Sequence, residues 1–422
     1  LIMNKGVMLR KYVHYILYDI YNSNKTIDTS FNRFNIHKLE SRDINFINNV
    51  CLNSMRFFFH TEKIVSLYVK KRPSLHQRLL LCSAITQIIY LNFKEYAVID
   101  SSVELAKKIK KQHSFINALL NKVVLNKDKL RNIQIEYKVL PEWFRRETNN
   151  LSIIEKKNFI FEYCKKPNLH VVFKNQKYLS YFKNKIIQTS SKSGFLNDVE
   201  KIEKIPSFKK GQWWVQDYSS FLPLHNIDDS LISGLNLDMC AAPGGKSFQI
   251  LSKGKNIVLN DISKKRIRIL KSNLERLEFK AEITNYNYEY ISETKRYNFI
   301  IIDAPCSAIG TIRKHPEIFF RNKEPDLKRL IELQKNILVK ASKLLDKNGV
   351  ILYMVCSFFK TETIDQIKNF LKDNQEFSIY NFPMDNDSKL TNIIKKNIML
   401  TLPTQIKGHN IDGYFATYLK KN

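Results

Sequence analysis

One stretch of sequence decides the fold of the carboxyl-terminal half of the chain: Leu237-Asp238-Met239-Cys240-Ala241-Ala242-Pro243-Gly244-Gly245-Lys246. Its first residues predict a strand, the small residues that follow predict a tight loop, and a helical pattern begins at Lys246. Two glycines let the backbone approach a ligand closely, and free amides at a helix start can bind a carboxylate or phosphate. The segment lacks the dinucleotide fingerprint and the Walker spacing, which disfavours NAD and ATP.

Strand-like and helix-like segments alternate from about residue 232 onward. In chain order they are LNLDMC, a helix from Lys246, NIVLND, SKKRIRILKSNLERL, YNFIIIDAP, a long helix and VILYMVCS. Such alternation predicts a parallel sheet with helices on both faces, and it places the ligand site at the carboxyl ends of the strands. We therefore expect a Rossmann-like α/β domain over residues 208–422.

Asp261 follows Gly245 by sixteen residues and ends the strand-like segment NIVLN. A carboxylate at this place can accept both hydroxyls of a ribose, so the spacing favours a cofactor that contains adenosine. The alternative interpretation is that Asp261 only caps the helix that follows it.

Two cysteines follow two of the predicted strands: Cys306 in the segment DAPCS that begins at Asp303, and Cys356 directly after LYMV. Because the carboxyl ends of neighbouring parallel strands meet at one edge of a sheet, we expect both thiols to face one crevice. A single buried cysteine is usually an inert small hydrophobe. A pair of them beside Asp303 and a cofactor loop indicates catalysis instead.

This constellation suits methylation at carbon 5 of a cytosine, an atom that is a poor nucleophile. A thiolate that adds to carbon 6 turns the ring into an enamine that can accept a methyl group, and the thiolate leaves again readily. The carboxyl group of Asp303 can hydrogen-bond the pyrimidine nitrogen edge and stabilise the charge that develops there. A base must then remove the proton from carbon 5.

Composition indicates a folded protein with a polyanionic partner. The chain has 69 Lys and Arg against 40 Asp and Glu, a formal net charge of +29 that attracts phosphate polymers. The alternative is an AT-rich genome, which raises the content of Lys, Asn and Ile without any RNA ligand.

Six cysteines without a C-x-x-C pair predict neither a zinc site nor disulfides, which favours a reducing cytoplasm. No apolar span long enough for a membrane is present, and the opening stretch lacks the pattern of a signal peptide.

The first part of the chain is helical in pattern. One apolar stripe at helical spacing comprises Leu9, Val13, Ile16, Leu17 and Ile20. Pro73 and Ser74 predict the start of a helix over LHQRLLLCSAITQIIYL, and Ser101 and Ser102 are expected to cap another. With 422 residues we expect three domains. They are a helical domain over 1–127, a small α/β linker over 128–207 with a strand at 169–173, and the α/β domain over 208–422.

The motifs resemble those of the RNA 5-methylcytosine methyltransferase family, and in particular its RsmB-type bacterial ribosomal-RNA enzymes. The matching segments are CAAPGGK at 240–246, DAPCSAIGTIRKHPE at 303–317, VCS at 355–357, TLP at 401–403, DGYFA at 412–416, WVQD at 214–217, FINALLNKV at 115–123 and PEWF at 141–144. The match spans nearly the whole chain. It implies a class I methyltransferase domain, a NusB-like RNA-binding domain before residue 127, and 16S ribosomal RNA as substrate rather than transfer RNA.

The resemblance also implies roles for individual residues. Cys356 would be the nucleophile and Cys306 would assist product release, with Asp303 and Lys246 counted among the catalytic residues. S-adenosylmethionine would be bound by Cys240, Ala241, Ala242, Pro243, Gly244, Gly245, Lys246, Asp261, Asn285 and Asp303. No metal is expected, and the protein is expected to be a cytoplasmic monomer.

Three positions depart from the family pattern. Val355 stands where a Thr usually precedes the nucleophile, and Asn285 or Asn287 stands where an Asp near the adenine is usual. The segment 173–175 reads Phe-Lys-Asn in place of Arg-Val-Asn in the linker. Two other readings therefore stay open: the same chemistry on transfer RNA, and an RNA-binding assembly factor that has lost catalysis. The first residue is Leu, and we expect Met3 or Met8 to be the initiator.

Overall fold

The computed structural model describes residues 4–182, 185–197, 202–383 and 393–422, so Met3 lies outside the described residues. The chain forms two compact units. The first contains residues 1–164 and 312–324, and the second contains residues 165–311 and 325–422. The predicted linker is thus divided, because its helices belong to the first unit and its strands to the second. Three domains with boundaries at 127 and 207 remain a proposal.

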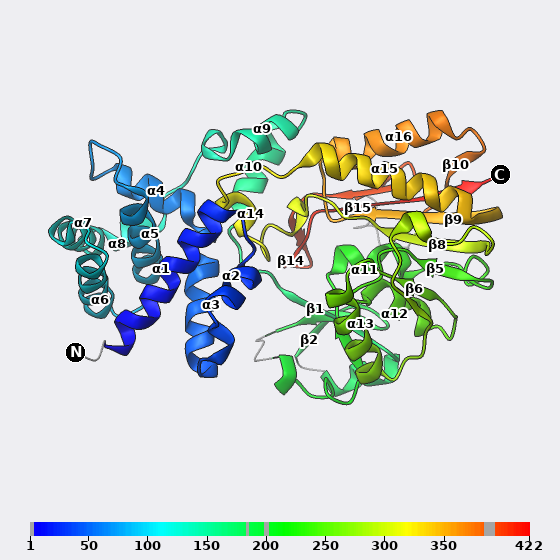
Figure 1. The fold of residues 1–422 in the computed structure, drawn as a ribbon, viewed down its shortest axis with the longest axis horizontal. Coiled ribbons are helices and arrows are strands. Elements are labelled where there is room, and N and C mark those ends of the chain that lie inside the picture. The colour runs from blue at the N-terminus through cyan, green and yellow to red at the C-terminus, as the bar shows by residue number, and fades with distance from the viewer. Residues whose placement is uncertain (1–3, 183–184, 198–201, 384–392) are drawn as a thin grey trace. The chain divides into compact units, whose positions relative to one another are not determined.

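The first unit is helical, as predicted (Figure 1). Its helices are α1 (Lys5–Ser23), α2 (Ile27–Arg33), α3 (Ser41–Arg56), α4 (Phe58–Ser66), α5 (Leu75–Ile89), α6 (Glu95–Lys108), α7 (His113–Leu125), α8 (Lys127–Arg131), α9 (Glu142–Glu147), α10 (Ile153–Glu162) and α14 (Glu317–Phe320). The stripe expected on α1 is buried along its whole length. The segment 312–324 joins this unit through Phe320, whose ring packs against Phe58 at 5.0 Å between centroids.

Two predictions about helix starts had different outcomes. Ser74 and Gln77 form a reciprocal capping box at the start of α5, as the sequence indicated. The prediction that Ser101 and Ser102 cap a helix was wrong, because α6 begins earlier, at Glu95. Both serines are buried inside α6, where Ser101 donates a hydrogen bond to the carbonyl of Ala97 and so does not need a helix end.

The second unit begins with a small antiparallel sheet in the order β2-β3-β1-β4. Its strands are β1 (Leu169–Phe173), which the sequence predicted, β2 (Ile186–Ser190), β3 (Ser193–Leu196) and β4 (Trp213–Val215). Phe173 is buried in the core of this sheet, and Lys174 lies 4.8 Å from the ring centroid of Phe279. Both residues that depart from the family's linker pattern, Phe173 and Lys174, therefore make packing contacts within this unit.

Within the described ranges, the main sheet has nine strands. Five are parallel, as predicted, in the order β7 (Ile283–Thr284), β6 (Val258–Asn260), β5 (Asn236–Asp238), β8 (Tyr297–Asp303) and β9 (Leu345–Val355). The others are β10 (Phe377–Tyr380), β11 (Ile394–Lys395), β12 (Ile398–Thr401) and β15 (Tyr414–Lys421). β15 pairs antiparallel with β9, which the expectation of a purely parallel sheet missed. The hairpin β13 (Thr404–Ile406) and β14 (His409–Ile411) lies outside this sheet.

Helices cover both faces of the main sheet (Figure 1). One face packs against α11 (Tyr218–His225), α12 (Gly245–Leu251) and α13 (Lys264–Leu277), and the other against α15 (Leu327–Leu344) and α16 (Ile364–Asp373). Along β8, Phe299 and Ile301 lie on the first face and Ile300 and Ile302 on the second, all fully buried. This alternation leaves only the strand ends free to carry polar chemistry. Among the described residues, no helix is both long and apolar enough to cross a membrane.

Candidate active site

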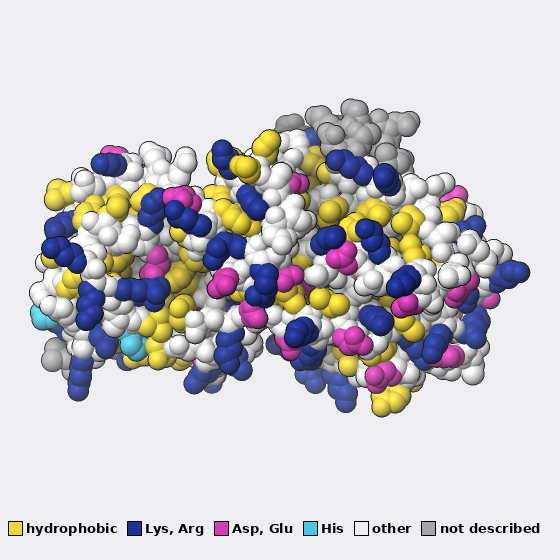
Figure 2. Space-filling model, turned by 90° about the horizontal axis from the view of Figure 1, so that it is seen from above, with side chains coloured by type: hydrophobic (Ala, Val, Ile, Leu, Met, Phe, Trp, Pro, Cys, Tyr) yellow, Lys and Arg dark blue, Asp and Glu magenta, His cyan; other side chains and the backbone are white. Residues whose placement is uncertain are grey.

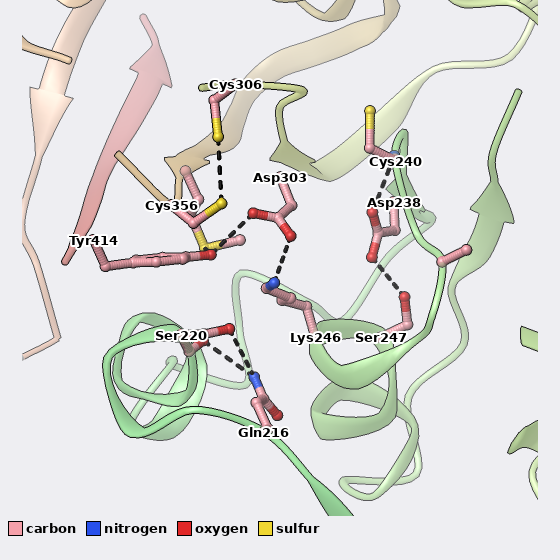
Figure 3. Close-up of polar contacts among 12 residues, drawn as sticks. Gln216, Ser220, Asp238, Cys240, Lys246, Ser247, Asp303, Cys306, Cys356 and Tyr414 are labelled. Atoms are coloured by element: carbon pink, nitrogen blue, oxygen red, sulfur yellow. Dashed lines mark hydrogen bonds and ion pairs between the residues drawn. The ribbon is translucent and has the colours of Figure 1, made fainter. Parts of the chain in front are cut away.

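The two predicted cysteines meet at the carboxyl ends of β8 and β9, which are neighbouring parallel strands. The Sγ atoms of Cys306 and Cys356 lie 3.3 Å apart, and both side chains are only partly buried (Figure 3). The backbone joins the two loops as well, since the amide of Gly310 donates to the carbonyl of Cys356 at 3.0 Å. The prediction that the two thiols come together at one edge of the sheet is confirmed by this distance, and the crevice that they were expected to face stays a prediction.

A side chain at position 310 is excluded by steric contact with the chain around Gly413. A Cβ at Gly310 would lie 1.8 Å from the carbonyl oxygen of Gly413, and the amide of Gly413 donates to the carbonyl of Gly310 at 2.9 Å. The loop that carries Cys306 therefore touches the chain just before β15, and only glycine allows the approach. This contact explains why a glycine occurs in both of the quoted segments, DAPCSAIG and DGYFA.

The protonation of Cys306 is controlled by its surroundings. The hydrogen bond with Cys356 raises the pKa of Cys306 well above its ordinary value, and burial and the charge of Cys356 raise it further. Cys306 is therefore a thiol at neutral pH as long as the sulfur of Cys356 carries no covalent adduct. Burial likewise raises the pKa of Cys240, so this third nearby cysteine is also a thiol.

Asp303 is held between two donors at the end of β8 (Figure 3). Lys246, from the first turn of α12, donates through Nζ to Oδ2, and the hydroxyl of Tyr414 in β15 donates to Oδ1 at 3.0 Å. Burial alone would lower the pKa of Lys246, but the charge and hydrogen bond of Asp303 outweigh it and raise the pKa. Burial, with the charge of Asp303, raises the pKa of Tyr414 well above its usual range. Both groups therefore remain proton donors.

Asp238 is a second acidic side chain at this edge. It ends β5, is 1% exposed, and accepts hydrogen bonds from Ser247 Oγ at 2.6 Å and the amide of Cys240 at 3.3 Å. Burial raises the pKa of Asp238 to about 7, an effect that the hydrogen bond from Ser247 only partly offsets. Sequence reasoning did not single out Asp238, although its place at the end of the strand before the glycine loop was a usable signal.

The loop 240–245 connects β5 to α12. Gly244 is the N-cap of α12 with a φ of +118°, and an added Cβ would meet the Phe248 ring at 2.0 Å, so this position requires glycine. The loop is fixed from outside by Asn273, which donates to the carbonyl of Pro243 at 3.1 Å, and by Arg266, which donates to the carbonyl of Ala242.

Asp261 and Asn285 lie together at the ends of β6 and β7. Asp261 is 1% exposed, and its carboxylate accepts from the amides of Ala242 and Ser263 at 3.2 and 2.9 Å. The carboxylate of Asp261 also forms an ion pair with Arg266 at 3.2 Å. The role of Asp261 as a ribose ligand stays a prediction. Asn285 donates through Nδ2 to the carbonyls of Asp261 and Ile262, which turns its Oδ1 away from them. Asn287 instead donates to Glu289 at 3.0 Å, which favours Asn285 as the adenine ligand.

These residues fit S-adenosylmethionine. The carboxylates of Asp238 and Asp303 suit its cationic methionyl part; Asp303 forms an ion pair with Lys246, and Asp238 accepts from Ser247 and the amide of Cys240. The Oδ1 of Asn285 can accept from an adenine amino group as an Asp would. Ile262, which is 65% exposed beside Asn285, offers an apolar surface for the ring. When bound, S-adenosylmethionine supplies an activated methyl group.

Two motif residues prove to be structural. Gln216, from the segment WVQD, accepts from Trp214 Nε1 at 2.9 Å. It donates to the carbonyl of Ser220 at 3.1 Å (Figure 3). Val355 is fully buried in an apolar cluster at the end of β9. Tyr414 was not singled out, although the quoted DGYFA segment contains it, and its contact with Asp303 depends on the unpredicted pairing of β15 with β9.

The comparisons with known proteins agree with this geometry. The family model described as 16S rRNA methyltransferase RsmB/F matches residues 228–420, and the NusB family model matches residues 8–125. Ribosomal RNA small subunit methyltransferase B of Vibrio vulnificus is 26% identical, over 84% of this chain and 89% of the relative. The protein of that name from Photorhabdus laumondii is 29% identical, over 70% of this chain and 74% of the relative.

Solved structures share the fold. The crystal structure of PH0851 covers 100% of both chains with a TM-score of 0.71 at 18% identity. NSun6 from Pyrococcus horikoshii, solved with SFG, covers 67% of this chain and 98% of its own with a TM-score of 0.56 at 15% identity. Residues 228–420 are thus similar to the 16S rRNA methyltransferase RsmB/F family, and residues 8–125, which precede them, are similar to the NusB family.

Proposed function

We propose that this protein transfers the methyl group of S-adenosylmethionine to carbon 5 of a cytosine in 16S ribosomal RNA, through a covalent bond between Cys356 and carbon 6. The observation that carries the proposal is the pair of thiols 3.3 Å apart at the ends of β8 and β9, beside the pair of Asp303 and Lys246. One sulfur can bond the base while the other stays close enough to exchange a proton.

Cys356 is the attacking sulfur in this mechanism, and its thiol proton passes to solvent as the sulfur bonds carbon 6. Its bond to carbon 6 makes carbon 5 nucleophilic, and negative charge develops on the ring nitrogen edge. The ammonium of Lys246 can donate a hydrogen bond toward this developing charge. The carboxylate of Asp303, which is paired with Lys246, can accept a hydrogen bond from the amino group of cytosine. Tyr414 keeps Asp303 in place through its hydroxyl.

Cys306 completes the cycle. Its pKa is raised first by the hydrogen bond with Cys356, then by burial and by the charge of Cys356. When Cys356 becomes a thioether, the hydrogen bond and the charge are gone, so the pKa of Cys306 falls and it can lose its proton to solvent. The Cys306 thiolate then takes the proton of carbon 5. The electrons of that carbon–hydrogen bond restore the double bond of the ring and expel the sulfur of Cys356.

The RNA partner is supported by charge and by the NusB-family region. The net charge is +29, and Lys and Arg side chains are spread over the face seen in Figure 2. Ribosomal RNA as substrate supports action in the cytoplasm.

One experiment tests reaction and substrate together. Small-subunit RNA and total transfer RNA are incubated separately with the protein and methyl-labelled S-adenosylmethionine, and the nucleosides are identified by mass spectrometry. Labelled 5-methylcytidine from the small-subunit RNA is the expected result, and Cys356→Ala should abolish it. Label in transfer RNA alone would replace the substrate. An absence of label, together with no heat of S-adenosylmethionine binding by calorimetry, would favour the assembly factor without catalysis.

A further inference from the structure

A buried glutamate lies behind the two cysteines. Glu362 follows β9 and is 0% exposed, and its carboxylate accepts four hydrogen bonds. Oε1 accepts from the amide of Ser307 at 2.8 Å and from Gln334 Nε2 at 3.0 Å. Oε2 accepts from the hydroxyls of Ser307 and Ser357 at 2.5 and 2.6 Å. A buried carboxylate with this many donors is stable without a counter-ion, and within the described part of the chain no Lys or Arg pairs with it.

The donors come from both catalytic loops. Ser307 directly follows Cys306, and Ser357 directly follows Cys356. Their hydroxyl oxygens lie 3.3 Å apart, the same separation as the two sulfur atoms one residue earlier. One carboxylate therefore bridges the loops directly beneath the thiols.

The glutamate is itself fixed by neighbouring elements. The hydroxyl of Tyr353 in β9 donates to the carbonyl of Glu362 at 3.1 Å. Gln334, from α15, is fully buried and also accepts from Tyr353 at 3.4 Å. Because its support comes from the packed core, Glu362 can hold two loops that have no regular hydrogen-bond ladder of their own.

We propose that Glu362 is the positioning residue that holds the loops of Cys306 and Cys356 together for methyl transfer. The inference rests on the proposed function and adds a residue that touches neither substrate nor cofactor. Its effect is on the separation and orientation of the two sulfurs, and a misplacement of about 1 Å in such a site can reduce a rate by about 100-fold.

Two substitutions separate positioning from charge. In Glu362→Gln, the amide oxygen can accept from the two N–H donors, while the amide nitrogen donates to the two serine hydroxyls, which can rotate to accept. Glu362→Ala removes all four bonds. We expect kcat for methylation to fall by about 100-fold in Glu362→Ala but by only about 5-fold in Glu362→Gln, with the KM for S-adenosylmethionine unchanged in both.

A matched control variant shows whether a loss of thermal stability alone lowers kcat. Asn236 is fully buried at the amino end of β5 and donates to the carbonyls of Ile232, Gly234 and Asn256. Asn236→Ala should lower the thermal midpoint as Glu362→Ala does but leave kcat unchanged. Ser357→Ala, which removes only the hydroxyl beside Cys356, keeps the test valid if Glu362→Ala does not fold, and we expect it to lower kcat by about 10-fold.

A second readout does not depend on catalysis. Diamide oxidises the two thiols to a disulfide while it is itself reduced, and the linked peptides of Cys306 and Cys356 can be quantified by mass spectrometry. The rate of disulfide formation should fall by about 10-fold in Glu362→Ala and Ser357→Ala. It should stay near the wild-type rate in Glu362→Gln and Asn236→Ala, because the effective concentration of the two thiols depends on the hydrogen bonds that residue 362 makes to both loops.

The outcomes are distinct. If wild-type protein does not methylate RNA but the disulfide rates follow this order, the proposed function fails and the positioning role stands. If wild-type protein methylates RNA and Ser357→Ala and Glu362→Ala keep both the wild-type kcat and the wild-type disulfide rate, the positioning role is overturned. Equal loss of kcat in Glu362→Gln and Glu362→Ala would also overturn it, in favour of a role for the charge.

Discussion

Asp238 offers a quantitative prediction about stability. Its pKa is raised from 3.8 to about 7, chiefly because burial disfavours the charged form. A folded-state pKa above the unfolded value means that the folded protein binds more protons, so this contribution to stability is complete below about pH 4 and is lost as the pH rises through about 7. At about 1.36 kcal/mol per pKa unit, the loss is at most about 4 kcal/mol.

The substitution Asp238→Asn removes the titration and keeps the local hydrogen bonds. The amide oxygen can accept from the amide of Cys240, and the amide nitrogen can donate to Ser247 Oγ. We therefore expect the variant to exceed the wild type in free energy of unfolding by only about 1 kcal/mol near pH 4.5. At pH 8 the variant should be more stable, by up to about 4 kcal/mol.

Urea unfolding of both proteins at the two pH values measures this difference, and subtraction of wild type from variant cancels the other titrating groups. Tryptophan fluorescence is a suitable signal because Trp213 and Trp214 are buried in the second unit. Asp346→Asn, at an exposed carboxylate of β9, is the control for the loss of one negative charge. A gain for Asp238→Asn that is the same at both pH values would refute the reasoning.

Three further predictions concern the site. Tyr414→Phe removes the 3.0 Å hydrogen bond to Asp303 and should lower kcat by about 10-fold with little change in the thermal midpoint; an unchanged kcat would exclude the contact from catalysis. Gly310→Ala places a Cβ 1.8 Å from the Gly413 carbonyl, so methylation should fall by about 100-fold; a wild-type rate would show that the close approach is dispensable. Asn285→Ala should weaken S-adenosylmethionine binding in calorimetry by about 10-fold, and unchanged affinity would assign the adenine to another residue.

The parts of the fold that depend on local pattern were predictable. The period of the apolar residues in α1, the capping residues before α5 and the strand-loop-helix pattern around Gly244 each depend on neighbours in sequence. Ser101 shows the limit of that reasoning, because a serine can satisfy its hydroxyl inside a helix as well as at its end.

The parts that depend on long-range pairing were not predictable. β15 enters the main sheet antiparallel to β9, and only this pairing places the Tyr414 hydroxyl against Asp303. Glu362 reads in sequence as one more charged residue, and its burial follows from donors on α15 and on two separate loops. The two cysteines were predictable because parallel strands bring their ends to one edge whatever the connections are.

The central claim is that Cys356 forms a covalent bond to the base and that Cys306 is needed to release it. Cys306→Ala protein, incubated with small-subunit RNA and S-adenosylmethionine, is digested and its crosslinked peptides are mapped by mass spectrometry. The account predicts an accumulated adduct in which a methylated cytosine is attached to Cys356, and none when Cys356→Ala is added to the same protein. An adduct on another residue, or normal turnover by Cys306→Ala without any adduct, would contradict it.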